Sequence, residues 1–234
     1  MATAIITGGS RGLGRALTDH LVRDGWRVVI DGRDPDRLVQ VAASLGSGVV
    51  TITGDVTDPD HRRQLVAAGA ADHDLQLVVN NASELGPSPL PPLADLGLEA
   101  LRRILEVNVV APLALTQAAL PHLDPTAGAV LSISSDAAVE AYPAWGGYGA
   151  SKAALDHAVR VLAAELDDSH PQLRVWSVDP GDMRTEMHQA AFPGEDISDR
   201  PAPEDVVPAL AAIIDLRPPS GRLVAADLLS EVTR

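Results

Sequence analysis

The 234-residue chain contains no cysteine, and aromatic residues make up only 3% of it. Without cysteine, the chain forms neither a disulfide nor a thiolate metal site, and no metal site of another kind is predicted. No apolar run approaches 18 residues, so no transmembrane helix is expected. The amino terminus lacks the basic segment of a signal peptide and is predicted to be a first strand, so we expect a cytoplasmic protein.

Basic residues are also scarce. Lys and Arg number 18 against 32 Asp and Glu, which gives a net charge of −14. This charge argues against nucleic acid and against an anionic membrane as partners. A negatively charged ligand would therefore need a local group of basic residues.

Short apolar segments alternate with helical patterns along the whole chain. Seven segments are predicted as strands: residues 3–7, 28–30, 49–53, 75–80, 129–134, 174–178 and 222–226. Helices are predicted between them, including a long one over residues 96–120 and another that begins at Tyr148. Continuous apolar strands joined by helices indicate an α/β fold with a parallel sheet covered on both faces. We predict a single doubly wound domain of Rossmann type over residues 1–234, with residues 186–204 as a substrate lid or loop.

A glycine-rich segment follows the first predicted strand. Gly8, Gly12 and Gly14 are spaced as G-x-x-x-G-x-G and open a helix. Glycines let the backbone approach a pyrophosphate, and the helix start offers free N–H groups. An ordinary glycine-rich turn is the alternative. Because ligands bind these sheets at the carboxyl ends of the strands, we expect the segments that follow the other strands to share this rim.

Three of the six aromatic residues fall within residues 142–152. In this window Tyr148 and Lys152 lie four residues apart where a helical pattern begins, so both side chains share one helix face. A phenol beside an ammonium is a plausible proton donor. Asn108 is a polar residue in an apolar helix, and Pro112 lacks the N–H that its carbonyl would accept. A packed helix kink without chemistry is the alternative interpretation of Asn108.

Four motifs occur in order along the chain: Thr7-Gly8-x-x-x-Gly12-x-Gly14, Asn80-Asn81-Ala82, Tyr148-x-x-x-Lys152 and Pro180-Gly181-x-x-x-Thr185. Together they resemble the short-chain dehydrogenase/reductase family over essentially the whole chain. The resemblance implies an NADP-dependent oxidoreductase that interconverts a small or medium apolar ketone or aldehyde and its alcohol.

The resemblance also implies catalytic roles. Tyr148 is the expected general acid and base, and Lys152 is expected to favour its phenolate and to bind the nicotinamide ribose. The family places its carbonyl-binding serine thirteen residues before the tyrosine, which selects Ser135 over Ser134. The carbonyl of Asn108 would hold a water in a proton relay.

Cofactor-binding residues are expected on every loop of the rim. They are Gly8, Ser10, Arg11, Gly12, Leu13, Gly14, Arg33, Asp55, Val56, Asn81, Ala82, Ser83, Tyr148, Lys152, Pro180, Gly181, Met183 and Thr185. Met183 replaces the family's usual valine, and Ser83 replaces its usual glycine. Asp55 has a second interpretation as a helix cap.

The residues after the second strand favour NADP over NAD. Gly32 stands at the usual acidic position, while Arg33 and Arg11 suit a 2′-phosphate. Asp31 keeps NAD open, although strand alternation should direct it to the opposite side. A surface arginine paired with Asp34 or Asp36 is the alternative for Arg33.

The substrate is expected to meet an apolar pocket. Its predicted border consists of Leu85, Ser135, Tyr142, Trp145, Met187 and Phe192, for which packing within a lid is the alternative. The resemblance implies a homodimer or homotetramer. A non-catalytic NAD(P)-binding sensor is the alternative function, but such proteins typically lose the tyrosine or the lysine, and both are present here.

Overall fold

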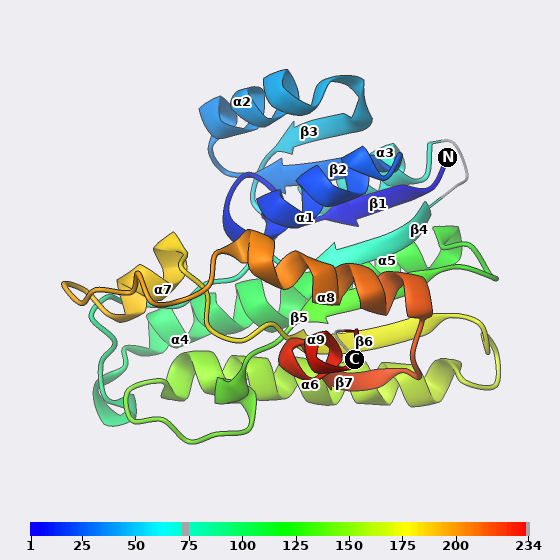
Figure 1. Cartoon of the computed structure of the whole chain (residues 1–234). Helices are drawn as coiled ribbons and strands as arrows, with labels where there is room; N and C mark the ends of the chain where they lie inside the picture. Colours follow the sequence, from blue (N-terminus) through cyan, green and yellow to red (C-terminus); the bar gives the residue numbers. More distant parts are fainter. Residues whose placement is uncertain (72–74, 233–234) are drawn as a thin grey trace.

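One seven-stranded parallel sheet runs through the centre of the molecule (Figure 1). The computed structural model describes residues 1–71 and 75–232, with side chains as far as residue 228. The strand order is β3-β2-β1-β4-β5-β6-β7, so the chain reverses its direction of winding after β3 and confirms the doubly wound prediction. The strands are β1 (Thr3–Ile6), β2 (Arg27–Gly32), β3 (Val49–Thr53), β4 (Leu75–Asn80), β5 (Ala129–Ile133), β6 (Arg174–Asp179) and β7 (Gly221–Val224).

Helices cover both faces of the sheet, which explains why its strands are apolar on both sides. One buried cluster joins the sheet to α1, α2 and α8, and a second joins it to α3, α5 and α6. The arrowheads of the strands in Figure 1 point toward the side where α7 lies. The helices are α1 (Gly12–Arg23), α2 (Pro35–Leu45), α3 (Pro59–Gly69), α4 (Leu98–Leu105), α5 (Ala111–Ala119), α6 (Gly146–Leu166), α7 (Glu186–Ala191), α8 (Pro203–Leu216) and α9 (Ala225–Val232).

The starts of α2 and α3 follow from two Asp-Pro pairs. The carboxylate of Asp34 accepts hydrogen bonds from two backbone N–H groups of α2, and Asp58 accepts one from Asp60. A proline then occupies the first turn, where its missing N–H costs nothing. Asp58 therefore caps α3, and the cap interpretation of Asp55 is wrong.

The long helix predicted over residues 96–120 begins at Leu98 and contains a π-turn. Residues Glu106–Val110 form this turn between α4 and α5, and the N–H of Ala111 bonds to the carbonyl of Glu106. The segment Leu98–His122 is long and apolar enough to cross a membrane by composition alone. Here α5 packs against α3 and α4 packs against α6, while Leu98, Val110 and Leu113 stay exposed.

The carboxyl-terminal prediction also needs a correction. A strand was expected to continue to residue 226, but β7 ends at Val224 and Ala225 already begins α9. The sequence Ala-Ala-Asp-Leu-Leu at residues 225–229 contains four good helix formers and an acid in the first turn, so the strand gives way to a helix.

Candidate active site

A cavity of about 700 Å³ lies at the carboxyl ends of the strands. The segments that follow β1, β2, β3, β4, β5 and β6 all contribute to its wall, as the sequence predicted. Its volume is that of a site for a dinucleotide or a drug-sized ligand. Within residues 1–71 and 75–232, no group of three or more His, Asp or Glu side chains could hold a metal ion.

The glycine loop forms one wall of this cavity. Gly8 has a φ of +67°, which favours glycine, and a Cβ on Gly14 would lie 2.4 Å from Nδ2 of Asn81. That amide instead donates to the carbonyl of Thr7 at 2.8 Å. The backbone of the loop is thus packed tightly against the residues that follow β4, and the first turn of α1 forms part of the cavity wall.

Asp31, near the end of β2, fixes this loop through a hydrogen bond to its backbone. Its carboxylate is buried and accepts hydrogen bonds from the N–H of Gly8 at 2.6 Å and from Nε2 of His61 at 2.8 Å. Both oxygens are therefore engaged inside the protein, although the residue borders the cavity. His61 comes from α3, and no sequence pattern linked it to this site.

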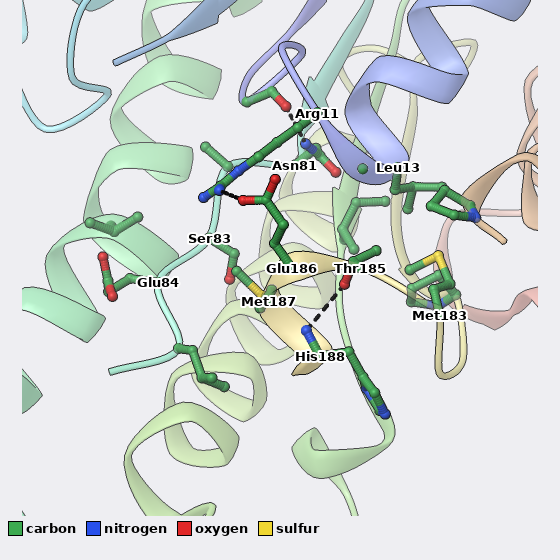
Figure 2. A pocket seen from close by; sticks show the side chains of 18 of the residues that line it. Arg11, Leu13, Asn81, Ser83, Glu84, Met183, Thr185, Glu186, Met187 and His188 are labelled. Atoms are coloured by element: carbon green, nitrogen blue, oxygen red, sulfur yellow. Dashed lines mark hydrogen bonds and ion pairs between the residues drawn. The ribbon is translucent and has the colours of Figure 1, made fainter. Parts of the chain in front are cut away.

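Arginine residues surround the outer end of the cavity. Arg33 is exposed, borders the cavity and forms no hydrogen bond or ion pair within the described part of the chain. Arg11 and Arg37 both form ion pairs with Glu186, and the Arg37–Glu186 distance is 2.8 Å. Figure 2 shows Glu186 reaching from α7 toward Arg11. Sequence reasoning missed Arg37, whose other partner is Asp34.

Asp55 and Val56 border the cavity after β3. Burial raises the pKa of Asp55, but hydrogen bonds from Thr57 and Arg103 outweigh burial and hold that pKa at about 2. The Asp55 oxygen lies 2.6 Å from the guanidinium of Arg103. Asp55 is thus an anion at neutral pH, oriented by α4.

Tyr148 lies at the inner end of the cavity and is almost fully buried. Burial raises the pKa of its phenol to about 12, although hydrogen bonds from Ser83 and Ser135 oppose this rise. Ser83, the residue in place of the family's glycine, therefore lowers the pKa of the phenol. The ring of Trp145 packs edge-on against Tyr148 with centroids 5.8 Å apart.

Lys152 is the only lysine in the sequence and is buried beside Tyr148. Its Nζ donates to the carbonyl of Ile133 at 2.8 Å and lies 5.5 Å from the centre of the Tyr148 ring. Burial lowers the pKa of Lys152 to about 8, while Asp156 acts in the opposite direction. The predicted approach of ammonium to phenol is present in the structure.

Asn108 occupies the π-turn and is fully buried behind the cavity. Its Nδ2 donates to Ser151 at 2.9 Å and to the carbonyl of Glu84 at 2.8 Å. Its Oδ1 accepts from Ser83 at 3.2 Å. Asn108 is thus hydrogen-bonded to Ser83, the residue that also lowers the pKa of Tyr148.

The structure brings only part of the predicted substrate border together. Leu85, Ser135, Trp145 and Met187 border the cavity. Tyr142 does not: it is 44% exposed and its hydroxyl donates to Asp136 at 2.9 Å.

Phe192 also lies outside the lining, where its ring packs 5.9 Å from Trp145 and 5.0 Å from His188. Five lid residues border the cavity, namely Glu186, Met187, His188, Pro203 and Glu204. No sequence pattern indicated His188.

The fold and the glycine loop are typical of dinucleotide-binding proteins. Comparison with known proteins shows to which family of such proteins the chain belongs. Residues 2–196 match the family model described as short chain dehydrogenase. The chain belongs to the short-chain dehydrogenase family.

Two relatives illustrate the range of the family. The chain is 36% identical over 189 residues to serine 3-dehydrogenase of Agrobacterium fabrum, covering 79% of this chain and 73% of that protein. It is 37% identical over 174 residues to short chain dehydrogenase asqE of Emericella nidulans, covering 70% of this chain and 64% of that protein. The match thus spans less than two thirds of asqE.

Solved structures match over nearly the whole chain. A short chain dehydrogenase of Escherichia coli CFT073 complexed with NADPH is 30% identical, with a TM-score of 0.86 and 96% of each chain covered. One from Shigella flexneri complexed with NADP is 29% identical, with a TM-score of 0.86 and 95% of each chain covered.

Proposed function

We propose that this protein is an NADP-dependent oxidoreductase that interconverts a small or medium apolar ketone or aldehyde and its alcohol. One observation carries the proposal: Tyr148, Ser135 and Lys152 converge at the buried end of a cavity whose outer end is bordered by arginines. Bound NADPH would supply the hydride. The protein must then supply a proton, orient the carbonyl and exclude water.

Tyr148 is the proposed proton donor to the carbonyl oxygen. Ser135 lowers the pKa of the phenol, borders the same cavity and is proposed to polarise the carbonyl oxygen. A phenol with a pKa of about 12 stays protonated at neutral pH, which suits the donor in reduction. In oxidation the phenolate is required, and the Lys152 ammonium stabilises it.

Asn108 is proposed to take part in the relay that returns a proton to Tyr148 after Tyr148 has donated one. Hydrogen bonds to Ser151 and to the carbonyl of Glu84 fix the Asn108 side chain, so the backbone carbonyl of Asn108 is also held in place within the π-turn. π-turns of this kind are frequent at functional sites. Asn108 acts by position and hydrogen bonding and needs no ionisation of its own.

The preference for NADP rests on charge at the outer end of the cavity. Arg33 has no competing partner within residues 1–71 and 75–232, and Arg11 and Arg37 lie around Glu186. A 2′-phosphate is a better partner for guanidinium groups than a single exposed carboxylate. Asp31, the residue that kept NAD open, has both oxygens engaged by Gly8 and His61.

Residues 186–204 are proposed to act as a lid over the substrate. Met187 and His188 of this segment border the cavity, as does Trp145. The apolar side chains favour an apolar substrate. A homodimer or homotetramer, with a single catalytic domain in each chain, completes the proposal; sedimentation as a monomer at micromolar concentration would contradict the oligomer.

The test is oxidation of NADPH and of NADH in the presence of a panel of carbonyl compounds. We expect turnover of apolar ketones or aldehydes, with higher kcat/KM for NADPH. Serine belongs in the reverse assay, because two relatives are named serine 3-dehydrogenases. Tight NADPH binding without turnover of any compound would favour the sensor alternative.

A further inference from the structure

A buried ionic cluster joins β6 and β7 to α6, the helix that carries Tyr148 and Lys152. Of its members, Asp179 borders the cavity, while Asp156 and Arg222 do not. The guanidinium of Arg222, on β7, reaches Asp156 through Nε at 3.0 Å and Asp179 through Nη2 at 3.0 Å. The side chains of Asp156 and Asp179 are only 6% and 8% exposed. Two carboxylates at this depth need a cation, and Arg222 is placed between them.

Each partner of Arg222 belongs to a segment that carries a proposed active-site residue. Asp156 lies one helical turn after Lys152 on α6, on the same face. Asp179 ends β6, and its other oxygen accepts from the N–H of Gly181 at 3.0 Å. Nη2 of Arg222 also donates to the carbonyl of Ser135 at 3.2 Å.

The sheet register explains why Arg222 points toward α6. Asn80, Ser132, Ser177 and Arg222 are aligned as neighbours across β4, β5, β6 and β7. This polar row lies on the face that α5 and α6 cover, since Val130 and Val175, two positions earlier on their strands, belong to the cluster on that face. Leu223, the next residue on β7, packs on the opposite face.

One oxygen of Asp156 is left over. Its Oδ1 is buried and has no hydrogen-bond partner within the described residues. The ammonium of Lys152 lies one helical turn away on the same face of α6 and is influenced by the Asp156 charge. Asp156 therefore divides its charge between Arg222, which it contacts, and Lys152, which it influences at a longer distance.

We propose that Arg222 is a positioning residue for the reaction proposed above: it holds Asp156 next to Lys152 and fixes the ends of β5 and β6 to α6. A lysine could not do the same, because only the guanidinium fork reaches two carboxylates and a carbonyl at once. The proposal rests on the proposed roles of Lys152 and Tyr148, but its test does not require turnover.

The charged groups around Lys152 set the expected result. Asp156 on α6 acts on Lys152 directly, and Arg222 on β7 pairs with Asp156. The other titratable groups at this end of the cavity are Tyr148 on α6, Asp136 after β5, Asp179 at the end of β6 and Glu84 after β4. Removing Arg222 takes away a cation and leaves the Asp156 carboxylate unneutralised, so the pKa of Lys152 rises. Removing the Asp156 charge takes away an anion, so the pKa of Lys152 falls.

Lys152 can be titrated directly, because a sample labelled at lysine gives one side-chain signal by NMR. In the wild type we expect a midpoint near its pKa of about 8. Arg222→Met should raise the midpoint and Asp156→Asn should lower it, each by roughly one pH unit. The double variant removes one charge of each sign and should return the midpoint close to the wild-type value.

Arg217→Met is the matched control. Arg217 also anchors the fold with a partly buried guanidinium, but it donates to the carbonyls of Ala127, Gly128 and Gln172, far along the sheet from Lys152. We expect it to lower stability without moving the midpoint. Shifts of the same sign in both single variants, or no shift beyond that of Arg217→Met, would overturn the proposal.

Activity separates this inference from the proposed function. If the wild type turns over, the pH profile of alcohol oxidation should move in the same directions as the Lys152 midpoint, while the KM for the alcohol stays near its wild-type value. If the wild type is inactive on every carbonyl compound, the proposed function fails, and the Lys152 titration still decides the role of Arg222.

Discussion

Asp31 could either stabilise the fold or bind the cofactor ribose, and the two roles predict different effects of mutation. Its two oxygens accept from Gly8 and His61, and its side chain is nearly inaccessible. Asp31→Ala leaves the buried His61 ring and the half-buried N–H of Gly8 without their partner, and a buried group left unpaired costs roughly 1–3 kcal/mol. We therefore expect the free energy of unfolding to fall by at least about 1–3 kcal/mol.

Urea unfolding followed by tryptophan fluorescence measures this loss. Asp31→Asn keeps an acceptor oxygen for Gly8 and should lose much less. Asp34→Ala removes an exposed helix cap on the same loop and should cost about 1 kcal/mol. The dissociation constants for NADPH and NADH, measured on the same samples, decide the role of Asp31. If Asp31→Asn keeps full stability and binds NADH tenfold more weakly, Asp31 is a ribose ligand and our reasoning is refuted.

Three further predictions concern the cofactor and the acid. Arg33→Ala should raise the Kd for NADPH roughly 10- to 100-fold relative to NADH in fluorescence titrations, because it removes a charged hydrogen bond to phosphate; an unchanged ratio would move the phosphate site to Arg11. Glu186→Gln should lower the Kd for NADPH by about two- to fivefold, because Glu186 competes for Arg11 and Arg37. Weaker NADPH binding by this variant would mean that Glu186 helps to hold the cofactor. Ser83 lowers the pKa of Tyr148, so Ser83→Gly should raise that pKa and shift the pH profile of alcohol oxidation to higher pH. A shift to lower pH would contradict this effect of Ser83.

The local motifs were predictable because each depends on neighbouring residues. Gly8 and Gly14 follow a strand and meet backbone at close range, and Asp-Pro pairs start α2 and α3. The strands β3 and β4 have the predicted bounds, since continuous apolar runs end where polar residues begin.

The remaining contacts join residues that no local pattern connects. Glu186 pairs with Arg11 and Arg37 across more than a hundred residues, and the buried Asp31–His61 pair joins a strand to a helix. Such pairs depend on where the lid and α3 pack. A single sequence carries no signal for that packing.

Closeness in sequence also misled the substrate prediction. Tyr142 and Trp145 stand three residues apart, but the chain turns between them, with Trp145 donating its N–H to the carbonyl of Tyr142 and Ala144 at a φ of +70°. The turn sends Trp145 to the cavity and leaves Tyr142 bonded to Asp136 on the outside.

The central claim is that Tyr148 donates the proton, and the two tyrosines of the chain allow a matched test. Tyr148→Phe and Tyr142→Phe each remove one phenol, and NADPH oxidation with the best carbonyl substrate gives kcat for both. We predict that Tyr148→Phe lowers kcat by about 10²- to 10⁴-fold with the Kd for NADPH nearly unchanged, while Tyr142→Phe stays near the wild type. Full turnover by Tyr148→Phe would contradict the account.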